Sequence, residues 1–373
     1  MLFSDVIGLD ELKKTLIHSV KNNHLAHTQL FLGMQGSPAL ALALAFSAYL
    51  LCEDPQENDA CGICAACSKN KKFIHPDLHF IFPVSTTKKV TKEPVSENFL
   101  PDWRNFLQNQ WYGDLSDWAK FFGAENKSCS ISKEESRNII KELALKPFEA
   151  EYKILLIWQP ENLHPTAANA LLKILEEPPG KSIFLLVGNE IEKILPTILS
   201  RTQLVKVRQF SDKELTENLV SKFNFDTKRA EQLSYLAEGN LTEALKLNEE
   251  ADDDNQAFFR DWMRLCYTKD FTKMVKWSES FQGLSKEAQK ILLQYGLSML
   301  RECMLWQLEV KELVKLMGDE LEFVKNFSKV LQPPQIENIS KQINSSFYHL
   351  ERNANAKILF LDLSLSVSKI LKE

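Results

Sequence analysis

The sequence predicts an α/β domain built on a parallel sheet, followed by two domains made of helices only. Short, continuous apolar runs indicate strands that are buried on both faces, as in parallel sheets. Helical patterns separate these runs, and after Val207 the strand pattern ends. A chain of 373 residues also exceeds what one ordinary core can hold. We therefore expect three domains, at residues 1–208, 209–250 and 256–373.

Four strands and three helices are predicted within the first domain. The strands cover the apolar runs at residues 30–32, 153–157, 182–187 and 203–207. An alanine-rich helix is expected over residues 39–51. A capping box at Ser132 opens a second helix, which extends to about residue 145. A third helix begins at Pro165 and ends before Pro178 and Pro179.

Residues 82–127 interrupt this alternation and are predicted to form an insertion with a small helical element of its own. A threonine- and lysine-rich tract is followed by many aromatic residues: Trp103, Phe106, Trp111, Tyr112, Trp118, Phe121 and Phe122. Such side chains can stack on single-stranded nucleic acid. Few basic residues lie between them, which favours packing against the main domain instead. The role of the insertion is left open.

The rest of the chain is predicted to be helical. Ser211 and Glu214 form another capping box, which opens the small domain at residues 209–250. An acidic linker follows at residues 249–254. From about Gln256 onward the apolar residues recur at the spacing of amphipathic helices.

Composition excludes several classes of protein. A hydrophobic content of 44% and a charged content of 25% are those of a globular protein, not a disordered or fibrous one. The longest apolar stretch is too short to span a bilayer, and the first residues do not resemble a signal peptide. We therefore expect a cytoplasmic protein. Because the net charge is −5, any contact with nucleic acid must be local or made through partners.

Residues 33–40 have the strand–loop–helix setting of a phosphate-binding loop, G-x-x-x-x-G-K-[ST], but lack its essential side chains. Gly33 and Gly36 remain. Pro38 stands at the last glycine, Ala39 at the lysine and Leu40 at the magnesium-binding hydroxyl. The lysine is the cation that reaches the β- and γ-phosphates, and a proline removes a backbone N–H donor. The loop therefore predicts a nucleotide site that no longer binds nucleotide.

The end of the predicted strand at residues 153–157 supports the same interpretation. A P-loop ATPase carries Asp-Glu at this point, for magnesium and for the attacking water. Here Trp158 and Gln159 occupy the two positions, and neither side chain can do this chemistry. Glu161 lies two residues further on and is not a plausible substitute.

Four cysteines are spaced C-x8-C-x2-C-x2-C, at Cys52, Cys61, Cys64 and Cys67. Two short intervals of this kind bring thiolates onto one ion, and four thiolates bind zinc tetrahedrally. In a reducing cytosol metal binding is favoured over disulfides. We predict a structural zinc site in a module at about residues 52–80, with no open position for catalysis.

Ser200-Arg201-Thr202 follows a short helical segment. Two interpretations are open. Arg201 can be a surface arginine near a helix C-terminus, or an arginine finger that reaches the ATP of a neighbouring subunit. Spacing alone favours the first.

Taken together, the chain resembles the clamp-loader branch of the AAA+ ATPases, and within it the delta-prime family of bacterial DNA polymerase III. The resemblance spans about residues 1–208 and includes the cysteine insertion after the first helix. It rests also on His75-Pro76-Asp77-Leu78, on Asn-Ala-Leu-Leu-Lys-Ile-Leu-Glu-Glu-Pro-Pro at residues 169–179, and on Ile198-Leu199-Ser200-Arg201. Thr202 replaces the usual cysteine, and the aromatic insertion is longer than the common pattern.

This resemblance implies a function. It implies that residues 209–250 form a lid, in which Thr242 replaces a sensor arginine, and that residues 256–373 form an oligomerising collar. It implies an ATP-inert subunit that supplies Arg201 in trans. The partners would be ATPase subunits of tau/gamma type and a delta subunit in a hetero-pentamer that loads a sliding clamp onto primed DNA. Two alternatives remain, an active tau/gamma-type ATPase and a free-standing zinc protein that binds nucleic acid.

Overall fold

The computed structural model describes residues 1–125, 127–143, 146–249, 254–284, 286–310, 313–314, 316, 318–352 and 354–372. The chain divides into two compact units. The first consists of Met1–Phe225 with Glu238–Glu243, and the second of Asp226–Ala237 with Ala244–Glu373. The predicted lid therefore contributes residues to both units. The three-domain division with a lid stays a prediction.

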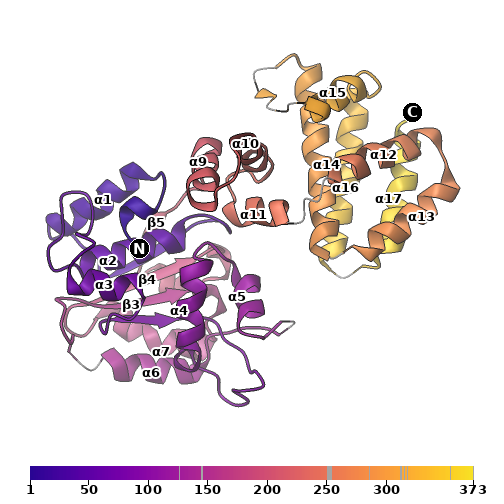
Figure 1. Cartoon of the computed structure of the whole chain (residues 1–373). Helices are drawn as coiled ribbons and strands as arrows, with labels where there is room; N and C mark the ends of the chain where they lie inside the picture. Colours follow the sequence, from indigo (N-terminus) through magenta and orange to yellow (C-terminus); the bar gives the residue numbers. More distant parts are fainter. Residues whose placement is uncertain are drawn as a thin grey trace. The chain divides into compact units, whose positions relative to one another are not determined.

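The first unit is built on a five-stranded sheet in which the strands of each hydrogen-bonded pair run parallel (Figure 1). The strands are β1 (Thr28–Leu32), β2 (Leu78–Ile81), β3 (Lys153–Trp158), β4 (Ser182–Gly188) and β5 (Gln203–Lys206), in the order β2-β3-β4-β1-β5. All residues of β3 and β4 are buried, which explains their continuous apolar sequences. The parallel α/β prediction is confirmed.

Strand β2 is the one strand that the sequence analysis missed. His79 interrupts its apolar run, so β2 lacks the continuous apolar sequence of β3 and β4. Asp77, directly before β2, holds the loop that leads to β3: its carboxylate accepts hydrogen bonds from the backbone N–H groups of Phe148, Glu149 and Ala150. Asp77, the third residue of the motif at residues 75–78, is thus a structural carboxylate.

Helices of the first unit alternate with these strands. They are α1 (Asp10–Lys21), α2 (Ala39–Leu50), α3 (Ala65–Lys71), α6 (Lys133–Leu143), α7 (Pro165–Glu176), α8 (Pro196–Leu199) and α9 (Asp212–Phe223). Every residue of α2 is buried, which accounts for its alanine- and leucine-rich sequence. Helix α7 ends before Pro178, and Ser211 caps α9, both as predicted.

The insertion forms a short 3-10 turn (Ser96–Phe99) and the helices α4 (Leu100–Asn109) and α5 (Leu115–Phe121). Its aromatic residues pack inward. Trp103, Phe106 and Trp118 are buried, and Trp103 stacks on Phe82 with ring centres 4.3 Å apart. Trp103 also contacts Trp158 at the end of β3, at 5.0 Å. These contacts confirm the packing interpretation.

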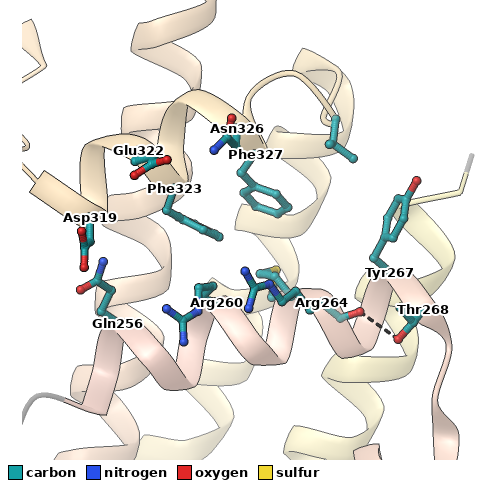
Figure 2. A pocket seen from close by; sticks show the side chains of 12 residues that line it. Gln256, Arg260, Arg264, Tyr267, Thr268, Asp319, Glu322, Phe323, Asn326 and Phe327 are labelled. Carbon is teal, nitrogen blue, oxygen red and sulfur yellow. Dashed lines mark hydrogen bonds between the residues drawn. The ribbon is translucent and has the colours of Figure 1, made fainter.

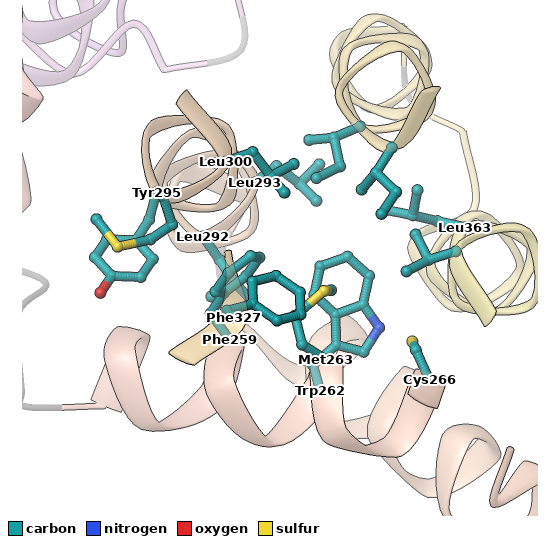
Figure 3. Close-up of a cluster of buried hydrophobic side chains, with 14 of the residues drawn as sticks. Phe259, Trp262, Met263, Cys266, Leu292, Leu293, Tyr295, Leu300, Phe327 and Leu363 are labelled. Carbon is teal, nitrogen blue, oxygen red and sulfur yellow. The ribbon is translucent and has the colours of Figure 1, made fainter. Parts of the chain in front are cut away.

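The second unit is helical throughout its described residues. It includes α10 (Thr227–Leu236), most of α11 (Leu241–Glu249), α12 (Asp254–Thr268), α13 (Phe271–Gly283), α14 (Lys286–Gln307), α15 (Gly318–Phe327), α16 (Pro333–Glu351) and α17 (Ala356–Ile370). Residues 250–253 of the predicted acidic linker lie outside the described residues. In Figure 3, Trp262, Met263 and Cys266 of α12 point toward Leu292 of α14 and Leu363 of α17, within one buried cluster. None of the described helices has the length and hydropathy needed to cross a membrane.

Candidate functional site

The phosphate-binding loop lies at the carboxyl end of β1, between β1 and α2. In the sheet, β1 lies between β4 and β5. The connections of the chain therefore lead to strands on both sides of β1. Such a switch point is where parallel α/β sheets usually bind ligands. The amide of Asn189, just after β4, donates to the Gly33 carbonyl at 2.9 Å. The loop therefore has the right place for a nucleotide.

The loop residues Pro38, Ala39 and Leu40 carry no positive charge that could bind a phosphate. Pro38 caps α2, and Ala39 and Leu40 are buried at 3% and 5% exposure, where the lysine and the hydroxyl would stand. Gly36 has φ +74°, and a Cβ there would meet the Oδ1 atom of Asn240 at 1.7 Å. Only glycine fits, because the segment Glu238–Glu243 lies directly against this turn.

The cavity that Gln35, Gly36 and Ser37 line has a volume of about 20 Å³. That is room for about one water molecule, whereas ligand pockets generally measure about 300–1,000 Å³. Its walls include the loop between α4 and α5, residues 111–114, as well as Trp158 and Gln159. The aromatic insertion, whose role the sequence left open, thus closes this side of the loop, whereas an open cavity of about 940 Å³ borders its other side at Gly33, Met34 and Asn189.

Tyr112 is one of the insertion residues that line this cavity. Its ring packs against Phe210 at 5.7 Å, and its carbonyl accepts a hydrogen bond from the Thr242 hydroxyl at 2.6 Å. Burial raises the pKa of the Tyr112 phenol. Thr242 is therefore bonded to the insertion. No sequence pattern predicted this contact, since the two residues are 130 positions apart.

The end of β3 offers no magnesium site. Trp158 is buried among the rings of the insertion, and Gln159 donates to Asn189. Glu161 is buried, which raises the pKa of its carboxyl, and it accepts a hydrogen bond from the Asn189 backbone.

Asp114 is a carboxylate at this cavity that the sequence analysis did not single out. Its two oxygens are occupied, one by the backbone N–H of Asp117 at 2.8 Å and the other by the Gln35 side chain at 2.5 Å. The sequence signal was only a capping box, Asp114 to Asp117, at the start of α5. Since both oxygens already accept hydrogen bonds, Asp114 supports the loop and does not replace the lost acidic pair.

The structure brings the four cysteines together. The Sγ atoms of Cys52, Cys61, Cys64 and Cys67 all lie within 4.8 Å of one another. The Sγ atom of Cys67 is 3.6 Å from that of Cys52 and 3.9 Å from that of Cys61. A tetrahedral zinc ion with bonds of about 2.3 Å requires sulfur atoms about 3.8 Å apart. The donor set therefore fits one zinc ion.

Backbone N–H groups also point at these sulfurs. The backbone N–H of Cys64 approaches the Cys61 Sγ at 3.4 Å, and that of Cys67 approaches the Cys64 Sγ at 3.3 Å. Hydrogen bonds from the backbone of Ile63 and Cys64 lower the pKa of the Cys61 thiol to about 7. The more buried Cys67 thiol has a raised pKa, because burial disfavours its charged form. Cys129, Cys266 and Cys303 are buried elsewhere.

Arg201 follows α8 and is 27% exposed. One terminal nitrogen donates to the Thr197 carbonyl at 2.8 Å, and the other forms an ion pair with Glu176 at 2.8 Å. Arg201 does not line the cavity of its own chain. Its charge is therefore available at a surface and not at the filled nucleotide pocket.

Another cavity lies in the helical unit, with a volume of about 590 Å³. In Figure 2, Phe323 and Phe327 of α15 point toward α12, which carries Arg260 and Arg264. Asp319 and Glu322 lie on the α15 side. The floor is thus apolar and the rim carries both signs of charge, which favours no particular ligand.

A family described as DNA polymerase III, delta subunit, matches residues 8–211, more than half of the chain. The chain belongs to this family, a clamp-loader family of DNA polymerase III.

Proteins with similar sequences are also named as subunits of DNA polymerase III. DNA polymerase III subunit tau of Bacillus subtilis is 26% identical over 67% of this chain and 37% of its own length. Subunit delta' of Pseudomonas aeruginosa is 29% identical over 47% of this chain and 41% of its own. Subunit delta' of Bacillus subtilis is 23% identical over 63% of this chain and 57% of its own. The match thus spans about two fifths to three fifths of these relatives.

Proposed function

We propose that this chain is an ATP-inert clamp-loader subunit of delta-prime type, which supplies Arg201 in trans to the ATP site of a neighbouring subunit. The observation that carries the proposal is the nucleotide pocket. It keeps its place at the switch point of the sheet, but the part beside Gly36, Ala39 and Leu40, where the motif would hold phosphates, has only about 20 Å³ open. The side chains around it include no lysine, Leu40 stands at the position of the magnesium-binding hydroxyl, and the Asp114 carboxylate already accepts two hydrogen bonds.

Arg201 suits a role on another subunit's nucleotide. A guanidinium offers a fixed fork of donors that fits phosphate oxygens. Its present acidic partner, Glu176, is 55% exposed, so the ion pair is weak and can exchange for a phosphate group. Arginine fingers of this kind raise the rate of phosphoryl transfer about 10³- to 10⁵-fold, or ~4–7 kcal/mol of barrier.

The cysteine module would hold one structural zinc ion. Four sulfur ligands leave no open position, so the metal would stabilise the fold and take no part in hydrolysis. The module is also joined to the first residues of the chain, because the Asp59 carboxylate accepts hydrogen bonds from the backbone N–H groups of Phe3 and Ser4.

The proposed partners are ATPase subunits of tau/gamma type and a delta subunit in a cytoplasmic hetero-pentamer. The helices from about Gln256 would form the collar that joins these subunits. Exposed apolar residues on α12 and α13 support such a contact: Tyr267 at 49%, Phe271 at 54% and Val275 at 41% exposure. Through the complex, the subunit would act on the sliding clamp and primed DNA.

The Arg201→Ala substitution tests the finger. The isolated chain should keep its melting temperature, because Arg201 is partly exposed and its ion pair is weak. The reconstituted loader should lose about 10³-fold or more of the turnover at the adjacent site. Clamp-dependent ATPase at the wild-type rate, in a loader that contains the variant, would reject the role. Arg137→Ala, which removes an exposed arginine on α6, is the matched control.

A second candidate is an active clamp-loader ATPase, because subunit tau is among the relatives with the longest match. Calorimetric titration of the isolated chain with ATP and magnesium separates the two. An ATP-inert subunit should show no binding up to millimolar nucleotide, whereas micromolar affinity would favour the ATPase.

A further inference from the structure

The loop between α4 and α5 touches each part of the first unit that surrounds the former nucleotide pocket. We define this insertion loop as residues 110–114. We propose that the insertion loop is a permanent internal occupant of the phosphate side of the pocket, beside residues 35–40, which blocks that side independently of the lost motif residues and holds the segment Glu238–Glu243 against the phosphate-binding loop. The inference rests on the proposed ATP-inert state and gives it a second, physical cause.

The first contact is with the phosphate-binding loop. Gln35 donates to the Asp114 carboxylate, which at the same time caps α5. Asp114 is only 8% exposed, so this polar contact is largely shielded from water. A charge-assisted hydrogen bond in such a place is stronger than one at the surface. It ties the end of the insertion loop to the turn that would otherwise face phosphates.

The second contact is with the segment Glu238–Glu243. Thr242 is 8% exposed, and its hydroxyl donates to the Tyr112 carbonyl at 2.6 Å. Next to it, the Leu241 backbone N–H donates to the Gly36 carbonyl at 3.3 Å. The segment is therefore bonded on one side to the insertion loop and on the other to the phosphate-binding loop.

The third contact anchors the insertion loop on β3 and α9. A Cβ at Gly113 would come within 2.6 Å of the Phe106 ring, so glycine lets the chain close over that ring. Phe106 in turn packs near Trp158 at the end of β3, with ring centres 6.4 Å apart. On the other side, the Lys222 ammonium of α9 lies 4.6 Å from the centre of the Trp111 ring. The loop is thus fixed from several directions.

These contacts make the blocked state a property of packing and not only of lost chemistry. Restoring the lysine and the hydroxyl at Ala39 and Leu40 would leave the same rings in the pocket. The insertion loop would still have to leave before a nucleotide could enter. Blocking is therefore testable without any nucleotide, by measuring how well the loop shields the floor of the pocket.

Ser37 is a suitable reporter, because it lines the cavity and is 8% exposed. In the full chain with Ser37→Cys, the rate of reaction with N-ethylmaleimide at position 37 is measured by peptide mass spectrometry. Adding Trp111→Gly with Tyr112→Gly should speed this reaction at least about tenfold. Phe148→Gly, which removes an aromatic ring that is 82% exposed in another loop, should leave the rate unchanged.

Equal rates with and without the two ring deletions, in chains that melt cooperatively, would overturn the proposal. If the double deletion does not fold, Thr242→Val decides. It keeps the side-chain shape but removes one hydrogen bond, so position 37 should react at least about threefold faster. An unchanged rate in that variant would then reject the proposal. The assay uses the isolated chain, so its result is independent of the Arg201→Ala experiment.

Discussion

At the scale of single residues, Arg201 is the side chain on which the proposed activity depends. Its guanidinium is held by the carbonyl of Thr197 and by the carboxylate of Glu176, and both partners come from the same unit. The carbonyl contact orients the side chain, whereas the carboxylate neutralises its charge. Glu176 is thus expected to compete with the phosphate of a neighbouring subunit for the same group.

Glu176→Gln tests this competition. The amide can still accept a hydrogen bond from Arg201 but no longer opposes its charge. Exposed ion pairs contribute ~0.2–1 kcal/mol, so we expect ATP turnover of the loader to rise by at most about fivefold. Glu177→Gln, which removes the adjacent charge, is the control and should have no effect. A fall in turnover to the level of Arg201→Ala would instead show that Glu176 is needed to position the arginine.

At the scale of elements, the start of α9 combines a capping box with an ion pair, and both stabilise this end of the helix. The Glu214 carboxylate accepts hydrogen bonds from the Ser211 backbone at 2.8 Å and from both terminal nitrogens of Arg208 at 2.7 Å. The bonds from Arg208, followed by those from Ser211, lower the pKa of Glu214 to about 2. The capping box therefore works together with an ion pair that follows β5.

This shift predicts a pH dependence. A carboxyl whose pKa is lower in the folded state stabilises the fold above its unfolded pKa, here about 4.5, and loses that effect as the pH falls toward about 2. The difference in urea midpoint between wild type and Glu214→Gln should thus be largest at pH 6 and smaller at pH 3. A difference that grows as the pH falls would contradict the assignment. Glu217→Gln, on the same helix, is the control.

The cysteine module is the other element whose role can be measured. We expect about one zinc ion per purified chain, and near zero in Cys61→Ser or Cys64→Ser. A ligand that binds only the folded state stabilises it, so chelation should lower the melting temperature. Metal content is read by mass spectrometry. Cys129→Ser removes a buried thiol outside the module and should keep the metal. A full zinc content in both ligand variants would refute the site.

At the scale of the whole molecule, two units have different tasks in the proposed assembly. The first keeps the sheet, the filled pocket and Arg201, and the second is a helical bundle with its own buried core. Because each has its own core, a surface change in one is expected to leave the fold of the other intact.

The collar is tested by Phe271→Asp with Val275→Asp, one turn apart on α13. Both side chains are more than 40% exposed, so the free energy of unfolding of the isolated chain should change by only about 0.5 kcal/mol. We expect the variant to be lost from the complex during co-purification with the ATPase subunits. Ile140→Asp, an exposed position on α6, is the control. Retention of the double variant at the wild-type level would place the contact elsewhere.

Local patterns in the sequence determined much of this molecule. Burial on both faces produces the continuous apolar runs by which β3 and β4 were predicted. The mostly exposed β5 was predicted as well, whereas β2, whose apolar run His79 interrupts, was missed. The spacing of Cys61, Cys64 and Cys67 predicted the cluster, because short intervals constrain the chain directly. The missing lysine and acidic pair could be read position by position, since those motifs are contiguous.

Only the tertiary structure decided what fills the pocket and what holds Arg201. Tyr112 and Thr242 are 130 positions apart, and Glu176 and Arg201 are 25 apart. Asn240 reaches Gly36 from still further along the chain. Periodicity reports which face of an element is buried, but not which distant element buries it. That choice is made by the packing of the whole unit, where aromatic rings with no helical or strand period close over the sheet.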